Sequence, residues 1–486
     1  MSQLMINNQK YSAEWIDLLS PNSYDATSSS SQPASSESSS ASISTLPGKI
    51  YPPRSGGVSF TTPDKSRLFS FAGYAEEITT ASTVERYVVN DLWEFVPYDE
   101  NASTNNHQWG WSKVVQNEEE DYIPGPRLAT ALAVLPLSSL ADTAITSGQN
   151  DGDSSSRAIL LGGWDPQTPG TGGVILDDVS MLDMNTLKWS TCTSTTSSSS
   201  EKECATVPGG PTSRHVAVSL SIPLENADND STTRRKNVIC LHNHRCEDQV
   251  LLLSAVDETS NAVEWKHQPT TGETPSSRGL HCAATIHNCQ TMVIFGGAAK
   301  DGNMSNESFI LDTITWKWTK LDCSCSKNLP SPRAGASLCT LDYDTVLLFG
   351  GAIPSSGGLV GLNDVWILNV DLESGIGRWD CLIENADDLV DEKSDDTLRP
   401  PGRNAATLCP IDATKLLPKR IIWKESGSTL SVAEEDDGSY FLLNGGWYPF
   451  RETSNLSETH SGDAFSMAYT IQNKLRTCCL EITTST

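Results

Sequence analysis

The chain has 486 residues, and its 34 basic and 61 acidic side chains give a formal net charge of −27 at pH 7. Such an acidic excess repels phosphate backbones and anionic lipid surfaces, so nucleic acid and membranes are poor partners for it. No apolar run approaches the roughly 20 residues that span a bilayer, and the N-terminal residues lack the basic and apolar regions of a secretory signal. We therefore expect a protein of the cytoplasm, or alternatively of the nucleus, and we expect it to be monomeric.

Cysteine usage agrees with a reducing compartment. The 13 cysteines are an odd number scattered along the chain, and most stand in apolar stretches such as SLCTL at 337–341. This spacing does not make a disulfide scaffold, so we expect reduced thiols that lie mostly in the core.

Taken from the N-terminus, residues 1–20 carry one extended segment, EWIDL at 14–18, and residues 21–48 are rich in serine. The serine-rich stretch lacks the apolar content that would order it, and the same holds for 191–204 and for the acidic run 384–396. We predict disordered segments at all three places. The simpler interpretation is that the serine-rich parts are spacers, and the alternative is that they are phosphorylated.

From residue 49 onwards the chain repeats a short apolar run that ends in small or polar residues. The six runs are LFSFAGY (68–74), AILLGGW (158–164), VICLHNH (238–244), MVIFGGA (292–298), VLLFGGA (346–352) and YFLLNGGW (440–447). An apolar run of this length that is stopped by a turn predicts a strand buried on both faces.

A proline and an arginine precede each run, and most runs are followed by an acidic residue close to an aromatic one, as in NDLWEF at 90–95. The arginines are Arg54, Arg127, Arg214, Arg278, Arg333 and Arg403. A tryptophan usually ends the unit, at Trp111, Trp189, Trp265, Trp318 and Trp379. Each unit thus reads as four strands, and four antiparallel strands per repeat make a propeller blade.

In this combination the diglycine, the acid–aromatic strand and the spaced tryptophan resemble kelch repeats, whose period is about 50 residues. The resemblance is to kelch proteins without an evident BTB or F-box domain. It implies an all-β, six-bladed kelch-type β-propeller at 49–486, with four antiparallel strands per blade and long disordered loop insertions. The blades are predicted at approximately 50–115, 122–192, 208–268, 273–322, 328–382 and 399–482.

Two blades depart from the repeat, and the last one must close the ring. Blade 1 has Ala72-Gly73 and blade 3 has His242-Asn243 where the diglycine stands elsewhere. An open edge strand invites aggregation, so the outer position of blade 6 needs a strand. The segment around Trp15, which we favour, and LRTCCLEI (475–482) both fit that position. We predict the third strand of this blade at GDAFSMAY (462–469).

Antiparallel tracing places the six arginines on the same face as the loops that follow the diglycines. Those loops carry Tyr74, Trp164, Trp447 and Tyr448. Arginine and aromatic residues are enriched in binding hot spots, and the kelch resemblance implies that the arginines hold acidic peptides through paired hydrogen bonds. Alternatively, each arginine joins its own blade to the next, and the loop tryptophans fold back into the core.

We predict a protein-interaction scaffold or adaptor that binds a partner peptide or protein through this face, without catalysis and without a cofactor. The alternative is a metal-dependent oxidase or lyase on the same fold. The best local metal candidate is Cys240-x-His242-x-His244-x-Cys246, because alternate residues of a strand point the same way. The whole run is too long for one ion, so at most His242 and His244, helped by His281, would share it. The sequence has no nucleophile elbow, phosphate-binding loop or dinucleotide fingerprint.

Overall fold

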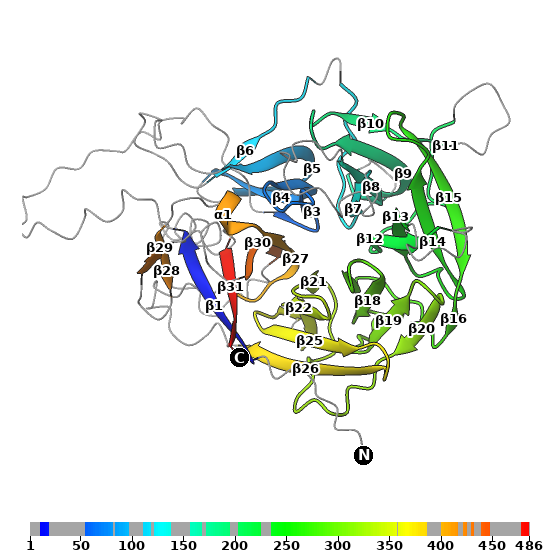
Figure 1. Ribbon diagram of the computed structural model, residues 1–486. Coiled ribbons are helices and arrows are strands. Elements are labelled where there is room, and N and C mark those ends of the chain that lie inside the picture. Colours follow the sequence, from blue (N-terminus) through cyan, green and yellow to red (C-terminus); the bar gives the residue numbers. More distant parts are fainter. Residues whose placement is uncertain are drawn as a thin grey trace, which may run out of the picture.

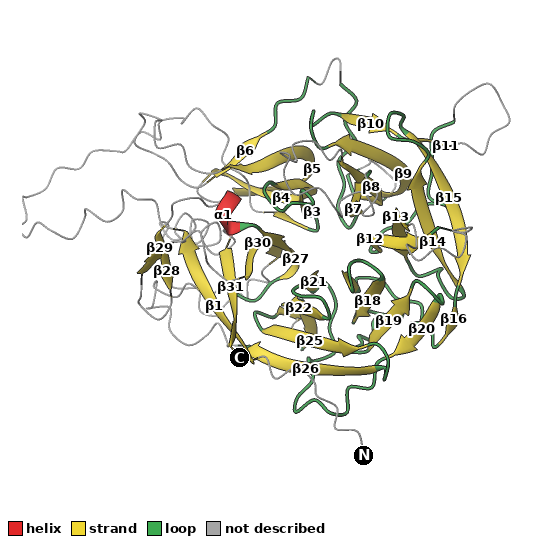
Figure 2. Cartoon of the chain, in the orientation of Figure 1, coloured by secondary structure: helices red, strands yellow, loops and turns green. Residues whose placement is uncertain are grey.

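Six β-sheets stand around a central axis in the computed structural model, and each contains four antiparallel strands arranged from the axis to the rim (Figures 1 and 2). The structure describes residues 10–18, 54–80, 83–96, 110–117, 121–137, 156–167, 172–194, 203–224, 235–356, 358–385, 400–416, 421–424, 429–431, 439–447 and 478–485. The fold is the predicted all-β propeller of six blades. The segment 21–48 and most of 191–204 and 384–396, where we predicted disorder, lie outside the described residues.

The first three blades follow one another along the chain. Blade 1 contains β2 (Arg54–Ser55), β3 (Val58–Thr61), β4 (Leu68–Thr80), β5 (Thr83–Val96) and β6 (Gly110–Lys113). Blade 2 contains β7 (Ala131–Pro136), β8 (Ser156–Asp165), β9 (Val174–Asp183) and β10 (Trp189–Thr191). Blade 3 contains β12 (Val216–Pro223), β13 (Arg235–His242), β14 (Gln249–Ala255) and β15 (Ala262–Pro269), with β11 (Thr193–Ser194) added at its outer edge.

The last three blades complete the ring. Blade 4 contains β17 (Cys282–Ile286), β18 (Thr291–Phe295), β19 (Ser308–Asp312) and β20 (Lys317–Lys320), with β16 (Thr271–Gly272) at its outer edge. Blade 5 contains β21 (Ser337–Thr340), β22 (Thr345–Phe349), β25 (Val365–Asp371) and β26 (Ile376–Ile383), and carries the hairpin of β23 (Ala352–Ser355) and β24 (Gly358–Gly361). Blade 6 contains β27 (Asn404–Ile411), β30 (Ser439–Trp447), β31 (Cys478–Ser485) and β1 (Lys10–Leu18), followed outwards by β28 (Ile421–Lys424) and β29 (Thr429–Ser431). The short helix α1 (Ala413–Leu416) follows β27.

The strand β1 lies beside the strand β31, so segments from the first and last parts of the sequence pair within blade 6. Trp15 pairs with Leu480, is fully buried, and places its ring edge-on against Phe349 of blade 5 at 5.6 Å between centroids. The segment 475–482, our other candidate for the outer strand, instead contributes to the third strand through β31. Our prediction of 462–469 for that third strand was wrong, and those residues lie outside the described part of the chain.

A closed ring of six backbone hydrogen bonds joins the blades where the chain enters each inner strand. In every blade one N–H donates to the carbonyl of the preceding blade, over 2.8 to 3.1 Å. The six residues are Gly56, Ala129, Arg214, Leu280, Gly335 and Ala405. All six have a positive φ, between +51° and +66°, which only glycine adopts without strain. Four non-glycine residues accept this conformation, so the ring geometry is imposed by the packing of the blades.

Tryptophans of the outer strands join neighbouring blades further from the axis. Trp189 packs on Phe71 of blade 1, and Trp379 packs on Phe295 of blade 4. In both pairs, as in the pair of Trp15 with Phe349, the phenylalanine directly precedes the small residues that end the second strand. Aromatic pairs of this kind add about 0.5–1.5 kcal/mol to the effect of burial. The tryptophan that ends each unit is therefore a structural residue.

The contact of Trp15 with blade 5 leads to a prediction about ring closure. We expect Trp15→Ala to lower the free energy of unfolding by about 3–5 kcal/mol, because it removes a fully buried indole between two blades. Ser12→Ala, an exposed position on the same strand, should change it by no more than about 0.5 kcal/mol. Urea denaturation of both variants measures this. Equal, small losses would show that β1 does not close the ring.

Candidate binding face

One side of the ring carries the linkers that lead from each outer strand to the next inner strand, together with the loops between second and third strands. We call it the linker face; the linker 114–130 and the loop 165–174 belong to it. All six predicted arginines lie in or next to these linkers. Their side chains nevertheless fall into two groups, because five are buried and one is exposed.

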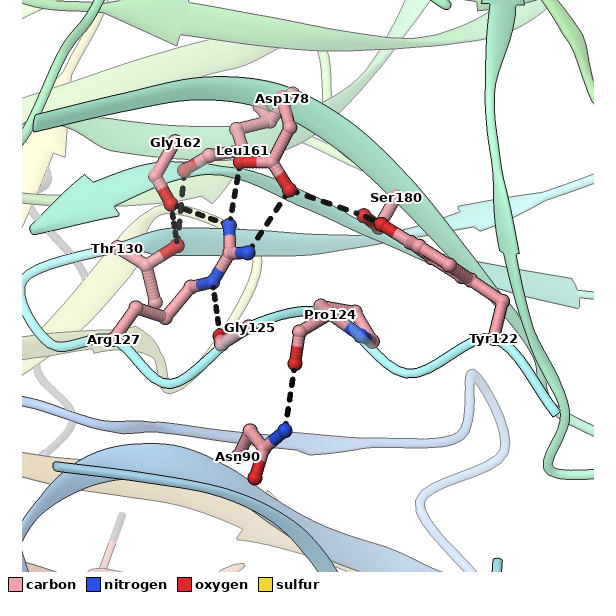
Figure 3. A network of polar contacts seen from close by, with 10 residues as sticks. All are labelled: Asn90, Tyr122, Pro124, Gly125, Arg127, Thr130, Leu161, Gly162, Asp178 and Ser180. Atoms are coloured by element: carbon pink, nitrogen blue, oxygen red, sulfur yellow. Dashed lines mark hydrogen bonds and ion pairs between the residues drawn. The ribbon is translucent and has the colours of Figure 1, made fainter. Parts of the chain in front are cut away.

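Arg127 shows the arrangement of the buried group (Figure 3). Its guanidinium donates to both carboxylate oxygens of Asp178, at 2.7 and 2.9 Å, and to the carbonyls of Gly162 and Gly125. Asp178 stands at the start of the core part of the third strand, and Gly162 is the first glycine of the diglycine. The arginine thus joins the inner, second and third strands of its own blade, and its donors are used within the fold.

The other four buried arginines repeat this geometry. Each donates to the carbonyl of the first residue of the diglycine or its equivalent, as Arg333 does to Gly350 over 2.9 Å. Three of them also pair with a carboxylate of the third strand: Arg54 with Asp91, Arg278 with Glu307 and Arg333 with Asp364. The five guanidiniums therefore bind groups within the fold, and these contacts join strands of one blade rather than one blade to the next, as our alternative interpretation had it.

The ion pair with Arg54 also affects the charge state of Asp91. Burial would raise the pKa of Asp91, but the Arg54 guanidinium and the indole N–H of Trp93 outweigh it and hold that pKa below its usual range. Trp366 donates to Asp364 in the same way, over 2.7 Å. The aromatic residue after the acid thus has a second role, since its N–H fixes the carboxylate that the arginine binds.

The sequence analysis missed the asparagine that precedes the acid in three blades. Asn90, Asn306 and Asn363 each donate from Nδ2 to a proline carbonyl of the following linker, over 3.0 to 3.2 Å. The acceptors are Pro124, Pro330 and Pro400, the first prolines of the motifs that end in an arginine. An Asn-Asp or Asn-Glu dipeptide at the third strand could have predicted this contact. Its acid binds the arginine of its own blade, and its asparagine binds the linker that leads to the next blade.

Arg214 does not occupy the position of the other five arginines, so our alignment of it with them was wrong. The residue two places earlier, Thr212, takes that position: the N–H of Gly163 donates to its carbonyl, as Gly297 does to Arg333. Arg214 instead lies on the backbone ring, where the other blades have glycine, alanine or leucine. Its side chain is exposed on the linker face.

Blade 3 has lost the whole ion pair rather than one member of it. Thr212 replaces the arginine, His242-Asn243 replaces the diglycine, and the buried Val250 stands where blades 1, 2, 4 and 5 have an acid. An acid left without its arginine would be a buried unpaired charge, which costs several kcal/mol, so the two losses are coupled. His215 stands between the ring residue and the inner strand, as Thr130 and His281 do in blades 2 and 4, and it too is buried.

The space vacated in blade 3 holds a pair of buried histidines. His242 Nδ1 lies 3.1 Å from Nε2 of His281 in blade 4, and its ring meets Trp318 edge-on at 5.6 Å between centroids. Burial lowers the pKa of His242 to about 3 and that of His215 to about 4, and it lowers the pKa of His281 as well. All three are therefore neutral at physiological pH. Within the described residues, no group of three or more histidine, cysteine or acidic side chains is placed to hold a metal ion.

The predicted aromatic residues lie at the ends of the second strands, with different exposure. Tyr74 and Trp164 are half-buried, while Trp447 is 40% exposed. Tyr448 lies outside the described residues. Two further apolar residues, Val174 and Ile175, face solvent on the strand that pairs with Trp164. Sequence reasoning did not single these two out, because a β-branched pair at a strand end is common in buried strands.

The six sheets, the inter-blade ring and the repeated arginine–acid pairs define the class of protein: a β-propeller built from six copies of one structural unit. The sequence profile of the KLHDC2/KLHL20/DRC7 Kelch-repeats domain matches residues 242–382. The chain is a six-bladed β-propeller, and its residues 242–382 match kelch repeats, as the resemblance of the motifs predicted.

Known proteins are similar to parts of the chain. Dynein regulatory complex subunit 7 of Chlamydomonas reinhardtii is 33% identical over 93 residues, which are 19% of this chain and 8% of that protein. Kelch domain-containing protein 2 of Bos taurus is 36% identical over 89 residues, 18% of this chain and 20% of that protein. Host cell factor 1 of Homo sapiens is 33% identical over 111 residues, 21% of this chain and 5% of that protein. The matched stretches therefore span a fifth or less of each of these relatives.

The fold comparison adds one solved structure. The structure of YjhT aligns with 82% of this chain and 96% of that chain, at 15% identity and a TM-score of 0.41. In the described part of the chain, no helix is long and apolar enough to cross a bilayer.

The two kinds of arginine predict opposite responses to the same substitution. We expect Arg333→Met to lower the free energy of unfolding by about 3–5 kcal/mol, because it leaves Asp364 buried without its partner. Arg214→Met should change it by no more than about 0.5 kcal/mol. Chemical denaturation of the two variants side by side provides the comparison, and similar losses in both would contradict the division.

The buried histidines predict acid sensitivity. Their folded pKa values lie below the unfolded value near 6.5, so the unfolded state binds more protons and stability falls as the pH drops from about 6.5 towards 4. For each histidine the loss approaches about 1.4 kcal/mol per pH unit. Between pH 6.5 and 5, the double variant His242→Gln, His281→Gln should lose clearly less stability than wild type. Parallel curves of unfolding free energy against pH would show that these histidines do not carry the effect.

Proposed function

We propose that the chain is a protein-binding module of the cytoplasm whose ligand site lies on the linker face, and that it acts by binding rather than by catalysis. The observation that carries the proposal is that the side chain of Arg214 is exposed, whereas the other five arginines are buried and bind groups of their own blades. The structure of this blade does not need its guanidinium, because the ring contact of Arg214 uses only backbone atoms. An exposed arginine beside the axis is a donor that a partner can use.

Apolar side chains on the same face supply the second element of a protein-binding site. Trp447, Val174 and Ile175 are 40%, 39% and 48% exposed, and the half-buried Trp164 and Tyr74 lie at equivalent strand ends of blades 2 and 1. Tryptophan, tyrosine and arginine dominate binding hot spots because they combine a large apolar surface with a polar group. Burying such residues against a partner releases more free energy than burying the polar loops around them.

The chemistry of the site indicates the kind of partner. Arg214 favours a carboxylate or another anionic group, which its planar guanidinium can bind through two hydrogen bonds. The aromatic residues favour an apolar side chain next to that anion. We therefore propose a peptide or protein segment that presents an acidic group beside an apolar one.

The names of the similar proteins are compatible with an interaction role. One of them is named a subunit of the dynein regulatory complex, and another is the dynein alpha chain of the flagellar outer arm of the same alga. These names describe those proteins, and they support for this chain only the coarser proposal of a propeller that binds another protein.

An affinity capture with matched variants tests the proposal. Wild-type protein, an Arg214→Glu, Trp447→Ser variant and a Glu264→Lys variant, whose change lies on the exposed outer strand β15, are incubated with extract of the source cell and analysed by mass spectrometry. We expect at least one partner that the first variant loses by about tenfold or more and the control retains, as for a hot-spot loss of about 1.4 kcal/mol or more. Partners captured equally by all three would place the binding site elsewhere.

A further inference from the structure

The opposite side of the ring, which we call the turn face, carries the turns between first and second strands and those between third and fourth strands. In blades 4 and 5 it displays three apolar side chains: Ile314 is 65% exposed, Tyr343 is 59% exposed and Leu372 is 38% exposed. Ile314 and Leu372 occupy the turns after the third strands, and Tyr343 occupies the turn after an inner strand.

Hydrogen bonds and a ring contact join these residues into one continuous surface across two blades. Tyr343 accepts a hydrogen bond at its carbonyl from the N–H of His287, and the two rings lie 4.9 Å apart. The turn of His287 is bonded to the turn of Ile314 through Gln290 and Thr313. On the other side, the carbonyl of Asp344, next to Tyr343, accepts from the N–H of Val370 close to Leu372.

The fold does not require an apolar residue at the tip of these turns. In blade 4 the turn is fixed by Asp312, whose carboxylate accepts from the N–H groups of Ile314 and Thr315. Asp183, Asp257 and Asp371 fix the equivalent turns of blades 2, 3 and 5 in the same way. The residues equivalent to Ile314 there are Asn185, Thr259 and Glu373, all polar. Ile314 therefore exposes apolar surface that the turn itself does not need.

Acidic side chains surround the apolar residues. Asp312, Asp342, Asp344, Asp371 and Glu373 lie in the three turns that carry Ile314, Tyr343 and Leu372, and Lys317 lies next to them at the start of β20. On a chain of formal charge −27, this surface repels a second copy of the protein and attracts a cation. Apolar side chains within a ring of acids match a partner whose own apolar side chains are flanked by lysine or arginine.

The backbone beneath the surface is rigid. His287, Asn288 and Cys289 are three successive residues with φ of +52°, +54° and +61°, a conformation that persists only where the surroundings fix it. The bond from the N–H of His287 to Tyr343 and the bond from the N–H of Ser221 to the carbonyl of Cys289 hold this turn between blades 3 and 5. A rigid surface loses little conformational entropy when it binds.

We propose that the turn face of blades 4 and 5 is a second interaction surface, and that it docks a basic amphipathic segment of a protein partner. Apolar side chains of that segment cover Ile314, Tyr343 and Leu372, while its lysines or arginines face the acids around them. This surface lies on the side of the propeller away from Arg214 and Trp447, so the two sites can be occupied at once and the protein can join two partners.

A set of three fluorescent peptides tests the proposal. The probe is an 18-residue amphipathic peptide of leucine, alanine and lysine; one control replaces its lysines with glutamate, and the other replaces its leucines with serine. Fluorescence anisotropy measures binding to the full chain, and hydrogen exchange of the chain locates it. We expect the lysine–leucine peptide alone to bind, with protection in the turns 287–290, 312–316, 341–344 and 371–375.

Matched variants decide whether the apolar residues carry the binding. The double variant Ile314→Ser, Tyr343→Ser should weaken binding of the lysine–leucine peptide by about tenfold or more. The control variant Leu329→Ser, which changes an exposed apolar residue of the linker face, should leave the affinity unchanged. A Glu373→Lys variant should weaken it and reduce its salt dependence. Thermal unfolding confirms that each variant is folded.

Several outcomes would overturn the proposal. Equal binding of the serine peptide would show unspecific attraction to an acidic protein, and no binding of any peptide would show that the surface does not take this class of partner. Protection from hydrogen exchange outside the four turns would show that the peptide binds elsewhere on the chain. A concentration-dependent increase in mass that Ile314→Ser, Tyr343→Ser abolishes would identify the occupant as a second copy of the chain.

Discussion

The closed ring of six backbone hydrogen bonds is the constraint on which the rest of the propeller depends. It fixes where each chain segment enters its inner strand, and it requires a left-handed residue at that point in every blade. Immediately before that point the linker must pass close to the end of the neighbouring blade's second strand. At Gly296 and Gly350 a Cβ atom would lie 2.8 Å from the carbonyl oxygen of the next motif arginine, so glycine is required there.

The buried arginine follows from the same geometry. The diglycine turn leaves a backbone carbonyl that points into the blade, and the third strand places a carboxylate beside it. A guanidinium binds both groups, because its planar N–H groups can donate to the two acceptors at once. Blade 3 shows what happens without the diglycine, since arginine and acid disappear together and a neutral histidine pair fills the space. The arginine that remains in its linker is shifted by two residues, which places Arg214 on the ring with an exposed side chain.

The two faces of the propeller differ in chemistry because the turns on each face serve different structural tasks. On the linker face five of the six motif arginines are consumed within the blades, and Arg214 and the aromatic residues are the groups that we propose for a partner. On the turn face aspartates fix the turns through backbone N–H groups and leave the surface negative. Opposite charge preferences on opposite faces are consistent with a module that joins two different partners.

The sequence by itself determined the number of blades, the strand types and the kelch-like repeat, because buried strands, diglycines and spaced tryptophans are local signals with a fixed period. It also indicated Trp15 as a candidate outer strand. Only the tertiary structure decided that β31 is the third strand of blade 6, that Thr212 and not Arg214 is the equivalent of the other arginines, and that Asn90, Asn306 and Asn363 bind the following linkers. These features depend on which atoms meet between blades, and a displacement of two residues, as at Arg214, cannot be read from a motif that still contains its proline and arginine.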